Sequence, residues 1–305
     1  MSATVPTSEG YVPFRGYRTW YRVVGDLANV GQGKLPVLML HGGPGAPHDY
    51  LESLEAFSAT GRPVIFYDQL GCGNSDRPDD PDLWTVALFL DELATVRRAL
   101  GLDRIHLLGQ SWGGMLAMEY ALTRPEGIAS LVIASSPASM PLWVAEANRL
   151  RAELPPEVQE TLLTHEAAGT TADPAYEEAV MVFYRRHVCR LDPWPDFVSR
   201  AFAKLGHQVY ETMNGPSEFH VIGRLKEWDI RDRLGEIRLP SLLTSGRYDE
   251  LTPMQAQIVR DGIPDCEWAL FEQSSHMPHA EEAEPYMAVL DDFLTRIEAG
   301  ATSGR

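Results

Sequence analysis

Ile105-His-Leu-Leu-Gly-Gln-Ser-Trp-Gly-Gly114 is the stretch of sequence that decides the fold. A strand is predicted over Ile105–Leu108, a turn over Gly109–Gly113 and a helix over Met115–Leu122. This order is typical of a nucleophile elbow, which holds its serine, here Ser111, in a strained turn with the hydroxyl exposed. Glycines flank the serine because a Cβ at either site would crowd the strand and the helix. An ordinary glycine-rich turn can carry the same pattern, so the elbow needs support from other motifs.

Short apolar runs alternate with amphipathic helices around this stretch. Buried runs that alternate with helices indicate a mostly parallel sheet with helices on both faces. The further strands predicted in the first half are Tyr17–Val24, Pro36–Leu40, Pro63–Tyr67 and Leu131–Ala134, with a helix over Trp84–Leu100.

The pattern changes after Pro137, where helices and prolines continue to Leu239 without a convincing buried strand. We therefore predict an α/β fold of the α/β-hydrolase type. Residues 1–137 and 239–305 would form its core, and residues 138–238 a helical cap inserted as a lid over the C-terminal edge of the sheet. A separate helical domain is the alternative. Insertion is favoured because the alternation resumes, with elements predicted over Pro240–Thr244, Pro253–Asp261, Trp268–Phe271 and Glu284–Ile297.

Composition narrows the class of protein. The chain has 305 residues, which suits one α/β domain with an insertion. Its net charge of −17 argues against nucleic acid or anionic membrane as partners, and no apolar run is long enough to span a membrane. Three cysteines without metal-type spacing, and no secretory signal, predict a cytoplasmic protein without a metal or other cofactor. A monomer is compatible with the sequence, which leaves the oligomeric state open.

A serine nucleophile needs an acid and a base, which follow it in that order in α/β-hydrolases. Asp249 lies in the loop after a buried strand and is the predicted acid. Its alternative role, capping the next helix, suits Thr252 better. His276 lies in the loop after the last strand and is the predicted base, with His279 as its rival. The predicted triad is therefore Ser111, Asp249 and His276.

The negative oxygen of an acyl-transfer intermediate needs two backbone N–H donors. One is predicted at Trp112, directly after the nucleophile. The other is predicted at Gly43 in the loop His41-Gly-Gly-Pro-Gly45, where small residues let the backbone approach a substrate. The alternative, a tight turn without a ligand, is harder to maintain beside an elbow.

These motifs together resemble the proline iminopeptidase (prolyl aminopeptidase) family of α/β-hydrolases. They span almost the whole chain in the expected order. The matching segments are His41-Gly-Gly-Pro-Gly45, Asp68-Gln-Leu-Gly-Cys-Gly-Asn-Ser75, Gly109-Gln-Ser-Trp-Gly-Gly114, Gly246-Arg-Tyr-Asp249 and Ser275-His276.

Within that family the chain is most similar to tricorn-associated aminopeptidases and L-amino acid amidases. The additional matches are Met213-Asn-Gly-Pro-Ser-Glu-Phe219 and Leu225-Lys-Glu-Trp-Asp-Ile230. The resemblance implies that Glu218 and Glu250 hold the free α-amino group of the substrate. Carboxylates suit an ammonium group in a partly desolvated pocket because they form charge-assisted hydrogen bonds with it. Without the resemblance, Glu218 would be interpreted as a solvated lid residue.

The chain departs from the family at Gln110, where many proline-selective members have glycine. This difference leaves room for a broader amidase. The pocket for the substrate side chain also stays open, because aromatic residues at such spacing are more often core. The candidates are Trp143, Phe183, Tyr184 and Phe219.

The sequence therefore predicts a serine hydrolase that acts through an acyl-enzyme. Its substrate would be a small peptide or amino acid amide with a free N-terminal residue, either proline or a small apolar one. One alternative is an esterase, or a biosynthetic hydrolase that cleaves an amide of a secondary metabolite. A third is a ligand receptor that keeps the hydrolase fold without catalysis.

Overall fold

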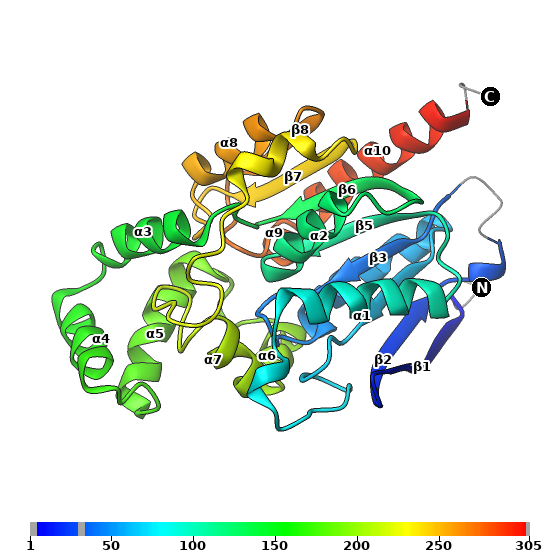
Figure 1. Ribbon diagram of the computed structural model, residues 1–305. Helices are drawn as coiled ribbons and strands as arrows, with labels where there is room; N and C mark the ends of the chain where they lie inside the picture. The colour runs from blue at the N-terminus through cyan, green and yellow to red at the C-terminus, as the bar shows by residue number, and fades with distance from the viewer. Residues whose placement is uncertain (1–4, 30–33, 303–305) are drawn as a thin grey trace.

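Within residues 5–29 and 34–302, which the computed structural model describes, eight strands form one sheet (Figure 1). Their order is β1-β2-β4-β3-β5-β6-β7-β8. β1 and β2 run antiparallel to their neighbours and the others are parallel. The strands are β1 Thr7–Phe14, β2 Tyr17–Val24, β3 Val37–Leu40, β4 Val64–Tyr67, β5 Ile105–Gln110, β6 Ile128–Ala134, β7 Ser241–Gly246 and β8 Cys266–Phe271.

Helices connect the parallel strands and also make up the cap. The α-helices are α1 Val86–Ala99, α2 Trp112–Leu122, α3 Met140–Arg151, α4 Pro156–Ala168, α5 Pro174–His187, α6 Asp196–Ala203, α7 His207–Met213, α8 Pro253–Gly262, α9 Pro278–Glu281 and α10 Ala283–Thr302. The 3₁₀ segments are η1 Leu27–Asn29, η2 His48–Thr60, η3 Pro81–Leu83 and η4 Arg231–Glu236. The predicted α/β class and mostly parallel sheet are confirmed.

Several predicted bounds shift by a few residues, as at β6, which begins at Ile128 and not at Leu131, and one strand was missed. α2 begins at Trp112 and not at Met115, because the turn at Ser111 leads directly into the first helical residue. β1 was not predicted, since only Val12 and Phe14 of its residues are buried. It pairs with β2 through a two-residue turn in which both residues have positive φ, the geometry that suits a tight hairpin.

The two faces of the sheet pack against different helices. Alternate residues of each parallel strand point to opposite faces, as in β3, where Leu38 and Leu40 join one core and Val37 and Met39 the other. Residues of α1, α2 and α8 complete the first core, and residues of η2 and α10 complete the second.

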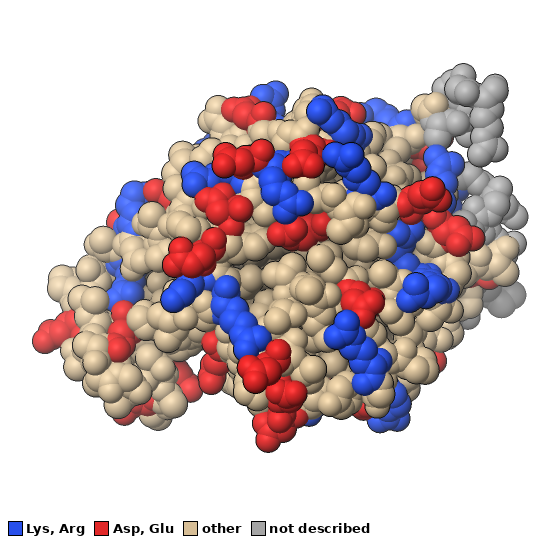
Figure 2. Space-filling view, in the orientation of Figure 1, with Lys and Arg blue, Asp and Glu red and all other residues tan. Residues whose placement is uncertain are grey.

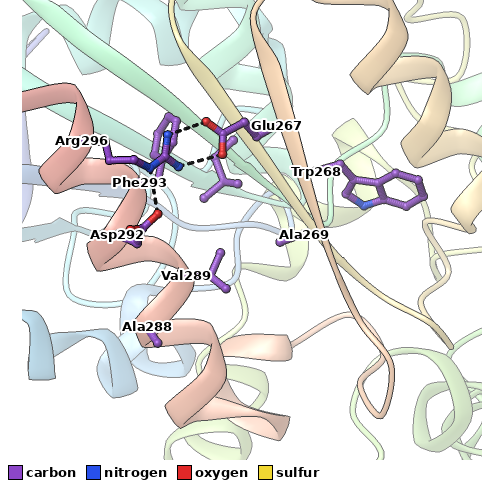
Figure 3. A pocket seen from close by; sticks show the side chains of 9 residues that line it. Glu267, Trp268, Ala269, Ala288, Val289, Asp292, Phe293 and Arg296 are labelled. Atoms are coloured by element: carbon purple, nitrogen blue, oxygen red, sulfur yellow. Dashed lines mark hydrogen bonds and ion pairs between the residues drawn. The ribbon is translucent and has the colours of Figure 1, made fainter. Parts of the chain in front are cut away.

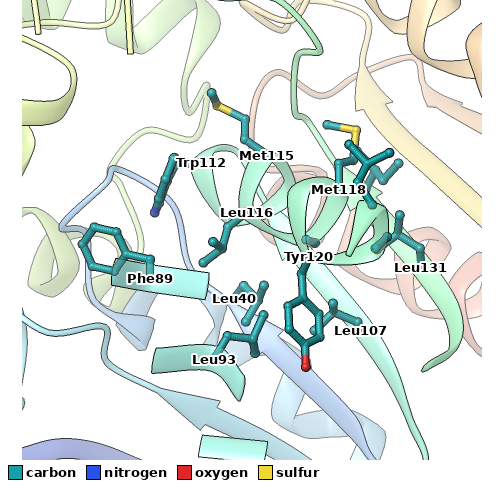
Figure 4. Packing of buried hydrophobic residues seen from close by; sticks show 14 of the residues in the cluster. Leu40, Phe89, Leu93, Leu107, Trp112, Met115, Leu116, Met118, Tyr120 and Leu131 are labelled. Atoms are coloured by element: carbon teal, nitrogen blue, oxygen red, sulfur yellow. The ribbon is translucent and has the colours of Figure 1, made fainter. Parts of the chain in front are cut away.

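The helix after the elbow, α2, lies in the middle of the first core. All of its residues except Glu119 are buried, which is typical of a helix inside a core. Figure 4 shows its side chains packed among those of β3, β5, β6 and α1. The labelled residues are Leu40, Phe89, Leu93, Leu107, Trp112, Met115, Leu116, Met118, Tyr120 and Leu131.

Helices α3 to α7 lie between β6 and β7 in the chain and gather at one end of the sheet (Figure 1). The chain enters and leaves this cap side by side. The N–H of Met140 donates to the carbonyl of Trp228 at 2.8 Å, and the N–H of Ile230 donates to the carbonyl of Ala138 at 2.9 Å. These bonds tie the two connections to each other at the edge of the core. The division into core and cap units stays a prediction.

Charges are interspersed over the face shown in Figure 2, where Lys and Arg side chains lie among Asp and Glu side chains. Exposed ion pairs occur among the described residues, as between Arg247 and Glu272 at 2.7 Å. In the part of the chain that the structure describes, no helix is both long and apolar enough to cross a membrane.

Candidate active site

Ser111 lies in the turn between β5 and α2, in a backbone conformation that L-residues rarely adopt (φ 54°, ψ −125°). Its N–H donates to the carbonyl of Ala134 in β6 at 2.9 Å. A Cβ on Gly109 would lie 2.1 Å from the carbonyl oxygen of Gly113, and a Cβ on Gly113 would lie 2.1 Å from that of Leu40. The turn therefore requires glycine at both positions, and the surrounding backbone holds Ser111 in its strained conformation.

Asp249 and His276 meet beyond the C-terminal ends of β7 and β8. Nδ1 of His276 lies 2.7 Å from Oδ1 of Asp249, which also accepts from the N–H of Leu251 at 2.8 Å. A carboxylate can only accept, so Nδ1 carries the proton and Nε2 is the basic nitrogen. Burial lowers the pKa of His276, but the carboxylates of Asp249, Glu218 and Glu281 together outweigh burial and leave that pKa above its ordinary value.

Ser111 and His276, both among the described residues, line one cavity. No hydrogen bond joins Oγ of Ser111 to Nε2 of His276. Nε2 instead lies 3.7 Å from Oε1 of Glu250. Catalytic hydrogen bonds of this kind often tighten only when substrate is bound. The rival histidine, His279, is buried beneath η2 with Nε2 3.0 Å from the carbonyl oxygen of Tyr50, and burial lowers its pKa to about 4.

The contacts of the loop after β3 set the direction of the Gly43 N–H. The carbonyl of Gly42 accepts from the N–H of Ala46 at 3.2 Å and from Nδ1 of His41 at 3.1 Å. In a trans peptide the N–H points away from the carbonyl, so the Gly43 N–H faces the opposite way. Neither it nor the Trp112 N–H has an acceptor among the described residues. A Cβ on Gly42 would lie 2.9 Å from the Cβ of Ser111, which places this loop against the elbow.

Gln69 connects the two predicted oxyanion donors, a role that sequence reasoning missed. Its N–H donates to Nε2 of His41 at 2.8 Å, which leaves the proton on Nδ1 for the Gly42 carbonyl. Burial lowers the pKa of His41 to about 4, so its ring is neutral near pH 7. The side-chain oxygen of Gln69 accepts from the indole N–H of Trp112 at 2.9 Å. The loop that begins at Asp68 therefore fixes both donors.

Cys72, in the same loop, is fully buried. Its sulfur lies 3.5 Å from Nε2 of His41 and 3.2 Å from the carbonyl oxygen of Gln69. Burial raises the pKa of the Cys72 thiol well above its ordinary value, so the reactive thiolate is disfavoured. We assign this cysteine no role in catalysis.

Gln110 links the elbow to the loop of His276. Its side-chain oxygen accepts from the hydroxyl of Tyr50 at 2.6 Å, and its Nε2 donates to the backbone carbonyl of His276 at 3.0 Å. The Tyr50 hydroxyl also accepts from the N–H of Gly42 at 2.7 Å. Gln110 borders the cavity, but both ends of its amide are bound within the protein.

A cavity of about 850 Å³ lies between the cap and the C-terminal end of the sheet. The predicted residues Gly43, Ser111 and His276 line it from the core side. Tyr184 lines it from the cap. The other three aromatic candidates are buried inside the protein, where Phe183 and Phe219 pack edge to face and the indole of Trp143 lies edge-on to the ring of His276.

Two carboxylates border this cavity beside the predicted base. Glu250 is fully buried, and neither of its side-chain oxygens has a hydrogen-bond partner among the described residues. Glu218 is half-buried and accepts from the hydroxyl of Tyr210 at 2.6 Å. Its backbone carbonyl accepts from the indole N–H of Trp143 at 2.8 Å, which holds the segment in place. Burial raises the pKa of both carboxyl groups. Charge repulsion from Glu218 and Asp249 raises the pKa of Glu250 further.

A smaller hollow of about 350 Å³ lies between β8 and α10 (Figure 3). Arg296 crosses it and binds Glu267 and Asp292, each at 2.8 Å. Its charged groups are therefore paired with one another, and we assign it no ligand. In the described residues no three His, Cys, Asp or Glu side chains are grouped as a metal site requires.

The fold and the serine elbow define a class of protein. A family model described as the alpha/beta hydrolase fold matches residues 36–283, so the chain is an α/β-hydrolase. A curated proline iminopeptidase from Clostridium botulinum is 43% identical over 95% of this chain and 98% of its own length. The chain therefore belongs to the proline iminopeptidase family, and the predicted family and class of enzyme are confirmed.

Two solved structures are similar over nearly the whole chain. The proline iminopeptidase of Mycobacterium smegmatis is 45% identical with a TM-score of 0.88, covering 96% of this chain and 100% of its own. The protein named VinJ is 48% identical with a TM-score of 0.91, covering 95% of this chain and 99% of its own. Both likenesses extend through the cap.

Proposed function

We propose that this chain is a serine aminopeptidase that removes an N-terminal proline or small apolar residue from peptides or amides with a free α-amino group. The observation that carries the proposal is the unpartnered, fully buried carboxylate of Glu250, which lies 3.7 Å from Nε2 of the predicted base His276. Buried carboxylates normally have hydrogen-bond partners. A buried carboxylate that has none and lies beside the predicted base therefore favours binding of a cationic ligand. The α-ammonium group of a substrate supplies that cation, with two N–H donors in proline and three in other residues.

The reaction follows from the positions of the other groups. His276 Nε2 takes the proton of the Ser111 hydroxyl while Oγ forms a bond to the substrate carbonyl carbon. The N–H groups of Gly43 and Trp112 hold the resulting oxyanion. The carbon–nitrogen bond then breaks, and His276 returns the proton to the leaving amine.

A water molecule releases the amino acid from the acyl-enzyme. His276 takes a proton from this water as its oxygen attacks the ester carbon, and the proton passes to Ser111 when the ester bond breaks. Asp249 holds the ring of His276 in the required tautomer and stabilises its charged form in both steps. The names of the curated relatives support proline as the residue that is removed.

The test compares prolyl and alanyl p-nitroanilides with a free or an acetylated amino group. We expect kcat/KM for the free amines to exceed that for the acetylated forms by about 10²-fold or more, because an acetylated substrate leaves buried carboxylates unpaired. Glu250→Gln should lose a similar factor, whereas Glu211→Gln, at the exposed rim of the same cavity, should not. Equal rates on free and acetylated substrates, or full activity in Ser111→Ala, would contradict the proposal.

The size of the cavity supports a second candidate, an amide hydrolase for substrates with a bulky apolar leaving group. A volume of about 850 Å³ lies in the range that holds a drug-sized ligand and exceeds what one amino acid needs. Apolar cap residues line it beyond the serine, among them Val180, Met181, Phe202 and Leu205. Alanyl amides of alkylamines of increasing length distinguish the candidates. A kcat/KM that rises with chain length favours the second, and a flat series favours the first.

A further inference from the structure

The carboxylate of Glu281, the last residue of α9, binds the backbone on both sides of His276. It accepts from the N–H of Ser275 at 2.8 Å and from the N–H of Met277 at 3.3 Å. It also accepts from the hydroxyl of Ser275 at 2.8 Å and from the N–H of Arg190 in the cap at 2.8 Å. All four partners are donors, which suits an ionised carboxylate that can only accept.

These contacts complete a three-sided support of the predicted base. Asp249 holds the ring of His276 at Nδ1, and Gln110 holds its backbone carbonyl. Glu281 holds the two neighbouring peptides. The position of Nε2 in the cavity is therefore set by the loop that Glu281 fixes, and a displacement of about 1 Å at a reacting group can cost about 10²-fold in rate.

Glu281 also contributes charge to the same ring. The groups that act on the pKa of His276 are its own burial, which lowers it, and Asp249, Glu218 and Glu281, which raise it. Glu250, 3.7 Å from Nε2, is the fourth carboxylate near the ring. Glu281 differs from Glu218 and Glu250 in that it does not border the cavity, and it does not contact the ring of His276.

We infer that Glu281 is a positioning residue for the base: it holds the His276 loop from both sides and joins that loop to the cap through Arg190. The inference rests on the proposed function, since it takes His276 to be the base. A second carboxylate offers a matched control. Glu282 accepts from the N–H of Gln273 at 3.0 Å and from the hydroxyl of Ser274 at 2.6 Å, so it binds the same loop but neither residue next to the base.

The test measures kcat and KM for prolyl p-nitroanilide between pH 5 and 9 in the wild type, Glu281→Gln and Glu282→Gln. Removing a negative charge near His276 makes its ring easier to deprotonate. We therefore expect the acid limb of kcat/KM in Glu281→Gln to move to lower pH. The kcat of this variant should fall about 10-fold and its KM should stay within about twofold. Glu282→Gln should keep both the wild-type kcat and the wild-type acid limb.

Thermal unfolding of the same proteins separates positioning from a purely structural role. A Glu281→Gln variant that unfolds at a lower temperature but keeps the wild-type kcat and acid limb overturns the inference, and so does equal behaviour of the two variants. Failure of the proposed function is recognised separately. In that case the wild type itself cleaves no aminoacyl p-nitroanilide, and a phosphonate probe does not label Ser111.

Discussion

The side-chain amide of Gln110 donates a hydrogen bond of 3.0 Å to the backbone carbonyl of His276, so the residue before the predicted nucleophile holds the loop of the predicted base. The same amide accepts from Tyr50, whose hydroxyl binds the N–H of Gly42 in the loop after β3. One buried chain of hydrogen bonds thus connects the predicted oxyanion loop, the elbow and the base. A buried polar network that is fully satisfied makes a site rigid.

Removing the hydroxyl of Tyr50 is expected to break this chain at its centre. In Tyr50→Phe the buried N–H of Gly42 loses its acceptor, which costs about 1–3 kcal/mol of stability. We expect kcat to fall about 10-fold with little change in KM, because the loop of the oxyanion donor is less well held. Steady-state kinetics and thermal unfolding measure the two effects.

Tyr67→Phe is the matched control for this variant. The hydroxyl of Tyr67 is also fully buried, but it has no hydrogen-bond partner among the described residues. Its removal should leave kcat unchanged and stability equal or slightly higher. A Tyr50→Phe variant with the kcat of the wild type would show that the chain of hydrogen bonds does not support catalysis.

Gly43→Ala should impair the oxyanion site itself. Gly43 has φ 104°, and a Cβ there would lie 2.6 Å from the N–H nitrogen of Ala46, so the loop must shift. The loss of one oxyanion donor typically lowers kcat by about 10²–10³-fold. Gly16→Ala carries a similar backbone cost, with φ 86°, in open space far from the site, and kcat should not change there. Comparable kcat losses in both variants would point to a general effect on folding.

Glu92 is expected to make the fold less stable as the pH rises. Its buried carboxyl accepts from the hydroxyl of Thr19 at 2.5 Å and from the N–H of Leu70 at 2.9 Å, and burial raises its pKa to about 8. Since this folded-state pKa lies above the unfolded one, the folded state binds the extra proton. Its contribution to stability is therefore full below about pH 4.5 and is lost as the pH rises through 8.

Glu92→Gln replaces this carboxyl with a neutral group of the same shape. The unfolding temperature of the variant should exceed that of the wild type by an amount that grows between pH 6 and pH 9. The buried His41 and His279, whose pKa values lie at about 4, titrate below this window and are shared by both proteins. A temperature difference that stays constant over the window would contradict the shifted pKa.

The sequence predicted the groups that lie in short motifs, and the structure adds those that depend on contacts between distant segments. Gln110 and His276 are 166 positions apart, so no local pattern could connect them. Gln69 stood within a motif of the family, yet its link to Trp112 required the packing of two loops. The early start of α2 was missed because Gly113 and Gly114, in its first turn, are poor helix formers.

A buried ion pair joins the C-terminal part of α10 to the core. Glu298 binds the guanidinium of Arg62 through both carboxylate oxygens and also contacts His106 and the N–H of Leu35. Burial opposes the charged form of Glu298, but these partners outweigh burial and lower its pKa to about 2. Glu298→Gln leaves the buried charge of Arg62 uncompensated, which typically costs about 3–5 kcal/mol. We expect a large fall in unfolding temperature with kcat unchanged at 25 °C.

Asp292→Asn on the same helix tests whether burial is what matters. Asp292 pairs with Arg296 at 2.8 Å, but its side chain is 68% exposed. Exposed pairs contribute about 0–1 kcal/mol and are screened by salt. The unfolding temperature of this variant should therefore stay close to that of the wild type. Equal losses in the two variants, or a Glu298→Gln loss that disappears at about 1 M salt, would mean that the Arg62 pair is not sealed from solvent.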